Sequence, residues 1–119
     1  MAYFEKQGLN PPLPPQEALY PQDGGMVDDL APLFKWTTAR EMDKGDRIDN
    51  YLIILSFDSQ CRWPAATALL RETGSGKPEW KLAEGWLNKD TAYYWQVKAM
   101  DNRSIWGEWS PVFSFRTAK

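Results

Sequence analysis

The sequence contains no histidine and only one cysteine, Cys61, among its 119 residues. The absence of histidine removes the commonest general base, the Ser-His and Cys-His nucleophile pairs and the usual zinc ligand sets. Because Cys61 is alone, no disulfide can form within the chain, and the fold must be held together by packing. The thiol either pairs with another chain or is buried as a small apolar residue.

Long apolar segments and a strong charge of either sign are also missing. No segment approaches the ~18 apolar residues of a membrane span, and the residues after Met1 contain no apolar stretch of signal-peptide length. The 14 basic and 16 acidic residues give a net charge of −2, so we expect no binding to nucleic acid and no insertion into a membrane. Either the protein stays inside the cell, or the chain is a piece of a longer exported protein.

Aromatic residues, in contrast, are abundant. They make up 14% of the chain and include seven Trp, five Tyr and five Phe, and such residues favour pleated, half-buried strands. The length is that of one ordinary domain. The composition therefore predicts one folded domain rich in β-structure and excludes disorder for most of the chain.

The N-terminal part is rich in proline. Four prolines between Pro11 and Pro15 favour polyproline II and exclude a central strand. We interpret this stretch as a stiff linker that runs into an edge strand, although the spacing of Pro11 and Pro14 also occurs in segments that bind SH3-like grooves. We assign residues 1–12 to a tail and proline-rich linker, and residues 13–119 to a folded domain.

Alternating apolar residues predict short strands in the rest of the chain, near residues 31–37, 51–57, 80–83, 91–100 and 111–117. Polar and glycine-containing turns separate these segments. About six or seven short strands with turns between them indicate a β-sandwich.

The strand predicted near residues 51–57 is apolar on both faces. One face carries four large apolar residues, Tyr51, Ile53, Leu55 and Phe57. The other face carries Leu52 and Ile54, which favours a central strand that is partly covered on both sides. Residues 65–72 are rich in Ala, Leu and Arg, which are good helix formers, so local preference there conflicts with an all-β pattern.

Four stretches, in order along the chain, resemble the fibronectin type III family in its bacterial type. Pro32–Trp36 resembles the second strand of that family, in which a Trp anchors the core, and Ile48–Ile53 resembles the third. Leu87–Ala99 resembles the stretch that forms the tyrosine corner of the family. Trp106–Ser110 is similar to the Trp-Ser-x-Trp-Ser box of cytokine-receptor type III domains, from which it departs at Gly107.

The resemblance implies an all-β, immunoglobulin-like Greek-key sandwich of about seven strands. Tyr93 would form the tyrosine corner, with its ring buried and its hydroxyl bonded to the backbone near Leu87. The core residues expected on this basis are Trp36, Tyr51, Ile53, Leu87, Tyr93, Trp95, Val97 and Phe115.

The same resemblance implies a function without catalysis. We expect a non-enzymatic interaction or spacer module of a larger exported bacterial protein, located outside the cell or at its surface. Its partner would be a protein or a neighbouring domain, and no cofactor or metal is implied. The alternative is an accessory module that binds polysaccharide through exposed Trp side chains.

Tryptophan exceeds what the core of such a domain requires. Four residues lie in or beside predicted loops: Trp63, Trp80, Trp86 and Trp106. They form either a platform for sugars or partner pockets, or a cover for the sandwich ends with cation–π contacts to Arg62, Lys98 or Arg103. Clustering of the first three on one face would favour the sugar-binding alternative, and burial under loops would favour the structural one.

Two weaker patterns do not support a site. Asp43, Asp46 and Asp49 are spaced by three, but they lack the alternation and the later Glu of the known calcium loop, so we expect a solvated loop. Gly74–Lys77 looks in part like a phosphate loop, but Arg71 and Pro78 stand where that loop needs Gly and Ser or Thr. We therefore predict no catalytic residue and no metal site.

Overall fold

The structure is a computed structural model, which describes residues 10–40, 45, 47–72 and 78–119. Asp43, Asp46 and the Gly74–Lys77 stretch lie outside the described residues, as does most of the predicted N-terminal tail. Within the described ranges there is no helix long and apolar enough to cross a membrane.

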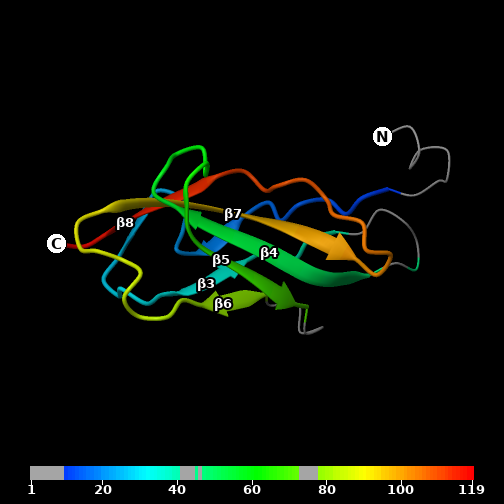
Figure 1. Cartoon of the computed structure of the whole chain (residues 1–119), viewed down its shortest axis with the longest axis horizontal. Helices are drawn as coiled ribbons and strands as arrows, with labels where there is room; N and C mark the ends of the chain where they lie inside the picture. The colour runs from blue at the N-terminus through cyan, green and yellow to red at the C-terminus, as the bar shows by residue number, and fades with distance from the viewer. Residues whose placement is uncertain (1–9, 41–44, 46, 73–77) are drawn as a thin grey trace.

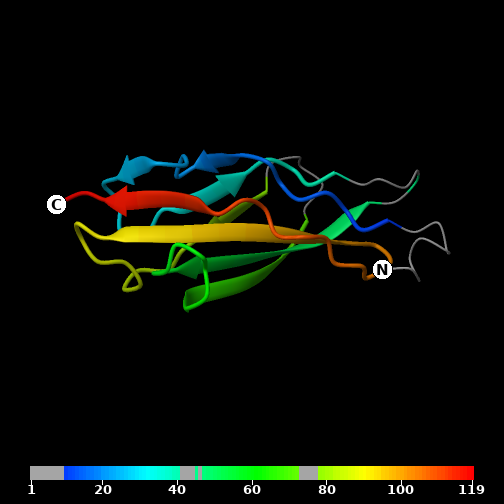
Figure 2. The same cartoon turned by 90° about the horizontal axis from the view of Figure 1, so that it is seen from above.

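The described residues form eight strands in two sheets, and Figures 1 and 2 show the two layers facing each other. The five-stranded sheet contains, in spatial order, β2 (Gly25–Val27), β8 (Phe113–Thr117), β7 (Ala92–Asp101), β4 (Ile48–Ser56) and β5 (Pro64–Arg71). The three-stranded sheet contains β1 (Ala18–Tyr20), β3 (Leu33–Trp36) and β6 (Glu79–Lys81). Neighbouring strands are antiparallel except β2 and β8, which run parallel. The predicted all-β, immunoglobulin-like sandwich is confirmed.

The core lies between the sheets and is built by the period of two in β7 and β4. In β7, every second residue from Tyr93 to Ala99 exposes 1% or less of its surface, whereas the residues between them are half-buried. The Trp95 ring lies 5.1 Å from the Phe34 ring of β3 across the layers, and 5.1 Å from the Phe113 ring of β8 within its own sheet. Each of the eight expected core residues lies here, with 5% or less of its surface exposed.

Strand β4 is central, with β7 on one side and β5 on the other, as its two apolar faces predict. Phe57, predicted to share a face with Tyr51, Ile53 and Leu55, packs its ring 5.6 Å from the Tyr93 ring, but 53% of the residue is exposed. The pairing with β5 becomes irregular between Leu55 and Ser56. Ser56 is completely buried there, and its hydroxyl donates to the Trp63 carbonyl at 2.7 Å, so Phe57 lies beyond the end of the strand.

Two buried tyrosines bond to backbone through their hydroxyls. Tyr93 Oη accepts the Asn88 N–H at 2.7 Å, one residue after Leu87, and this is the predicted tyrosine corner. Tyr51 Oη accepts the Ala39 N–H at 3.1 Å. Burial raises the pKa of the Tyr51 hydroxyl well above its ordinary value of 10.0. The Tyr51 hydroxyl thus satisfies the donor of the buried Ala39, which the apolar core would otherwise leave unpaired.

The proline-rich segment, interpreted above as a stiff linker that runs into an edge strand, packs on the sandwich. Pro12 is buried, and Leu13 exchanges two backbone hydrogen bonds with Arg40, of 2.7 and 3.2 Å. A Cβ at Gly107 would collide with the Pro12 carbonyl oxygen. The departure from the Trp-Ser-x-Trp-Ser pattern at this position therefore has a steric reason, because only glycine leaves room for the N-terminal segment.

Candidate functional site

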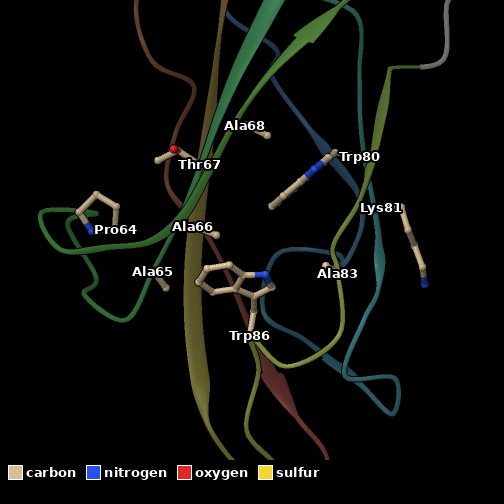
Figure 3. Close-up of a pocket in the computed structure, with 9 residues that line it drawn as sticks. All are labelled: Pro64, Ala65, Ala66, Thr67, Ala68, Trp80, Lys81, Ala83 and Trp86. Atoms are coloured by element: carbon tan, nitrogen blue, oxygen red, sulfur yellow. The ribbon is translucent and has the colours of Figure 1, made fainter.

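Two of the four loop tryptophans lie together. Trp80, which is half-buried, and Trp86, which is 49% exposed, line one cleft of about 500 Å³. Figure 3 shows both rings beside the alanines of β5. The remaining lining residues are Pro64, Ala65, Ala66, Thr67, Ala68, Lys81 and Ala83.

The cleft lies between the edge strands of the two sheets, where the side chains of β5 are too small to fill the space between the layers. Strand β5 is the edge of the five-stranded sheet and β6 is the edge of the three-stranded sheet. The inward positions of β5 include Ala66 and Ala68, whose small side chains leave space between the layers. Trp80 fills part of this space, and its position is fixed by the Phe34 ring, 5.5 Å away.

Trp86 reaches the cleft from a turn. Gly85, just before it, has a φ of 97°, a conformation that residues with a Cβ rarely adopt. Leu87, just after it, is buried in the core. The turn is therefore held at both sides of Trp86, while half of the indole surface stays open to solvent.

Beside the two indole N–H groups, the polar side chains that line this cleft are Thr67 and Lys81. The Lys81 ammonium is already used, since it donates to the Ala31 carbonyl and lies 3.8 Å from the Asp29 carboxylate. Among the described residues there is no group of three or more His, Cys, Asp or Glu side chains that could hold a metal. The cleft therefore offers apolar surface and indole faces in preference to charge.

The other two loop tryptophans lie elsewhere. Trp63 is 70% exposed and stands outside the cleft lining, although Pro64 next to it belongs to that lining. Trp106 packs on the Lys98 ammonium at 5.1 Å, and Trp109 packs on the same ammonium at 4.7 Å. The structure thus brings Trp80 and Trp86 together and separates them from Trp63 and Trp106.

Of the three predicted cation–π partners, Lys98 makes such contacts. Arg62 instead forms an ion pair with Asp58 at 2.9 Å. The hydrogen bond from Arg62 holds the pKa of Asp58 down at about 2. Cys61, beside this pair, is 8% exposed, and burial raises the pKa of its thiol to about 11. The thiol is therefore a small buried group in the chain as described here.

Sequence reasoning missed an apolar row on the outer face of the five-stranded sheet. Leu52 of β4 is paired with Leu69 of β5 on one side and with Lys98 of β7 on the other. Leu69 is 63% exposed, and the two tryptophans on Lys98 extend the row. The apolar second face of β4 indicated this row in the sequence. Its continuation onto β5 was not predicted, because the composition of residues 65–72 favours a helix.

The comparisons with known proteins agree with this architecture. A family model described as the N-terminal immunoglobulin domain of Rha78A-like proteins matches residues 18–119. Among curated proteins, nothing matches. The resemblance to immunoglobulin-like, fibronectin type III folds is confirmed at the level of the fold.

Solved structures of similar fold include two large enzymes. The α-L-rhamnosidase of Dictyoglumus thermophilum matches with a TM-score of 0.67 and 18% identity, over 92% of this chain and 12% of that one. The Streptomyces avermitilis α-L-rhamnosidase complexed with L-rhamnose matches with a TM-score of 0.68 and 19% identity, over 91% of this chain and 10% of that one. The sixth type III domain of human fibronectin type III domain containing protein 3 matches with a TM-score of 0.48 and 16% identity, over 92% and 85% of the two chains.

Proposed function

Since the chain belongs to the family of N-terminal immunoglobulin domains of Rha78A-like proteins, we propose that it is a non-catalytic accessory module of a larger, exported bacterial protein. Two observations support a larger parent: the chain spans only 12% and 10% of the two rhamnosidase chains whose fold it shares. We propose that the parent is a rhamnosidase-like enzyme and that its catalytic groups lie in other domains. The sandwich, residues 13–119 in this proposal, makes contacts that hold a neighbouring domain.

The observation that carries this proposal is the apolar row on the outer face of the five-stranded sheet. Leu69 exposes 63% of its surface there, Leu52 beside it is half-buried, and Trp106 is 36% exposed. Contiguous apolar surface on a folded domain marks a contact with another protein surface more often than scattered single residues do. A neighbouring domain laid against this face would remove that surface from water.

The contact can be tested by supplying this chain in trans to the parent protein that lacks it. Calorimetry should detect binding, and Leu52→Gln should weaken it at least tenfold, which is about 1.4 kcal/mol. Met26→Gln provides the matched control, because Met26 is 66% exposed but lies on β2, at the opposite edge of the same sheet. Equal binding by both variants would show that the outer face is not the contact.

A second candidate function is polysaccharide binding in the cleft, which the convergence of Trp80 and Trp86 favours. Indole faces stack on sugar rings, and a cleft of about 500 Å³ is large enough for small ligands. The engagement of Lys81, the charged side chain of the lining, with Ala31 and Asp29 weighs against this function, because sugar recognition also needs side-chain hydrogen bonds.

Intrinsic Trp fluorescence during titration with a panel of polysaccharides tests the second candidate. A saturable change that disappears in Trp86→Ala and persists in Trp106→Ala would support a sugar site in the cleft. Trp80 is unsuitable for this test because its ring packs against Phe34 in the core, so its removal would also disturb the fold. Absence of any response across the panel would eliminate the sugar-binding function.

A further inference from the structure

Every charged side chain that the strands of the five-stranded sheet direct to its outer face is basic. Lys98 alternates with the buried residues of β7, and Arg71 and Arg116 hold the equivalent outward positions of β5 and β8. The acidic residues of these strands, Asp49 and Asp101, fall in the inward series of β4 and β7, and Asp101 is 1% exposed. The strands therefore give this face a positive charge, although the whole chain carries a net charge of −2.

Two of these three charges have no carboxylate partner among the described residues. Arg116 is paired with Asp90 at 3.1 Å. The Lys98 ammonium lies against two indole rings, which attract it but do not neutralise it. Arg71 is exposed at the end of β5, and within the described ranges its guanidinium forms neither an ion pair nor a hydrogen bond. Lys98 and Arg71 therefore leave two positive charges on this face for a partner.

Arg71 borders a hollow of about 310 Å³ in which the other charged groups already have contacts. The remaining lining residues are Arg47, Asp49, Asn50 and Glu72. Arg47 pairs with Asp49 at 3.2 Å. Glu72 acts on the buried Tyr51 hydroxyl, since burial first and then this carboxylate raise the pKa of Tyr51 above its ordinary value of 10.0. Asn50 is the cross-strand neighbour of Arg71, so a guanidinium and an amide line the hollow together.

The two unpaired cations flank the apolar row of the outer face. The row contains Leu52 of β4 and Leu69 of β5, which are paired, and Lys98 lies on the other side of Leu52. Arg71 follows Leu69 by two residues on the same face, which is roughly 7 Å of strand. Apolar residues bordered by polar ones are the usual arrangement of a protein interface. Two cations are too few for a polyanion such as nucleic acid, which needs many basic contacts, but they fit single carboxylates of a protein.

We propose that the outer face binds an acidic surface of the neighbouring domain, and that a carboxylate of that domain pairs with the Arg71 guanidinium at the hollow. This inference rests on the proposed function, because it concerns the same face. A planar guanidinium offers two parallel N–H donors to a carboxylate, and such pairs are among the strongest polar contacts in proteins. Arginine is also enriched among the residues that carry most of the binding energy of an interface. Lys98 supplies a second attraction on the other side of the row.

Calorimetry with the parent protein that lacks this domain tests the acidic contact over a series of salt concentrations. Binding of the unchanged chain should weaken severalfold between about 0.05 and 0.5 M NaCl, because salt screens exposed charges. Arg71→Glu should raise the dissociation constant at least tenfold and reduce the salt dependence. Lys89→Glu is the matched control with the same change of net charge, and it should leave binding unchanged. Lys89 is exposed in the turn before β7, at the end of the sheet opposite to Arg71.

Arg71→Lys separates charge from geometry. It keeps the positive charge but loses the planar pair of donors, so its dissociation constant should lie between those of the unchanged chain and Arg71→Glu. Equal effects of Arg71→Glu and Lys89→Glu, or binding that salt does not weaken, would overturn the acidic contact. If Leu52→Gln weakens the binding while Arg71→Glu does not, the accessory-module function stands and this inference alone fails. No binding by the unchanged chain would overturn the proposed function, and this inference with it.

Discussion

The centre and the β5 edge of the five-stranded sheet use their residues differently. At the central strand β7, backbone groups are bonded within the fold: the Ala99 and Val97 carbonyls accept the Gly107 and Ser110 N–H groups at 2.8 and 2.7 Å. At the β5 edge, alanines face inward, a cleft remains and, among the described residues, the strand pairs with β4 alone. The same sheet therefore holds the domain together at its centre and keeps surface available for contacts at this edge.

The largest expected difference concerns tryptophan. Trp95→Ala should lower the free energy of unfolding by about 3–5 kcal/mol, because it empties the centre of the core. Trp86→Ala should lower it by less than about 0.5 kcal/mol, since half of that side chain is already in water. Urea denaturation of the two variants gives the comparison. Similar losses in both variants would mean that the centre of the sheet and its β5 edge do not differ in packing.

Replacing one alanine in each region with leucine tests the same difference in packing by adding side-chain volume. Ala99, on β7, is 1% exposed, and Ala99→Leu should destabilise the domain by about 1–3 kcal/mol through overpacking. Ala68, on β5, borders the cleft, so Ala68→Leu has space to enter and should change stability by less than about 0.5 kcal/mol. Thermal unfolding followed by calorimetry measures both. A large loss of stability in Ala68→Leu would show that the cleft has no room for the larger side chain.

The tyrosine corner provides a test limited to one hydrogen bond. Tyr93→Phe removes the acceptor of the Asn88 N–H and should cost about 1–3 kcal/mol, because the donor loses its partner beside a buried ring. Tyr20→Phe is the matched control, since Tyr20 lies on β1 and is 39% exposed. If chemical denaturation gives the two variants equal stability, the corner contributes nothing measurable.

The smallest effect is expected in the loop that leads into β5. The pKa of the Cys61 thiol is raised to about 11 by burial, so little thiolate exists near neutral pH. Alkylation at pH 8 should be roughly a hundredfold slower than that of a free cysteine, and the rate should rise as the pH approaches the raised pKa. Rapid alkylation at pH 8 would show that this loop opens readily in solution.

The sequence predicted the strands whose own residues alternate between large apolar and other side chains. Strands β4 and β7 were predictable because every second residue is large and apolar, as in Tyr93 and Trp95. Strand β5 was not predictable from its own composition, since its alanines and leucines favour helix. Pairing with β4 overrides that preference, which local reasoning does not include.

The candidate sites were only partly predictable. Exposed tryptophans could be suspected from their loop positions, but the meeting of Trp80 with Trp86 depends on the edges of two different sheets. Trp63 lies one residue before β5 and outside the cleft lining, which its loop position did not predict. Likewise, the steric need for Gly107 arises from Pro12, which is distant in the sequence.

The parallel pairing of β2 with β8 has a mechanical consequence. The described chain enters the sandwich at one end and leaves it at the other, at the right and left of Figure 1. Tension applied through both ends would pull these two strands in opposite directions along their length. The hydrogen bonds between Gly25–Val27 and Phe115–Thr117 would then be loaded together, in shear. They would resist extension collectively, where an antiparallel hairpin pulled at its two ends opens one bond at a time.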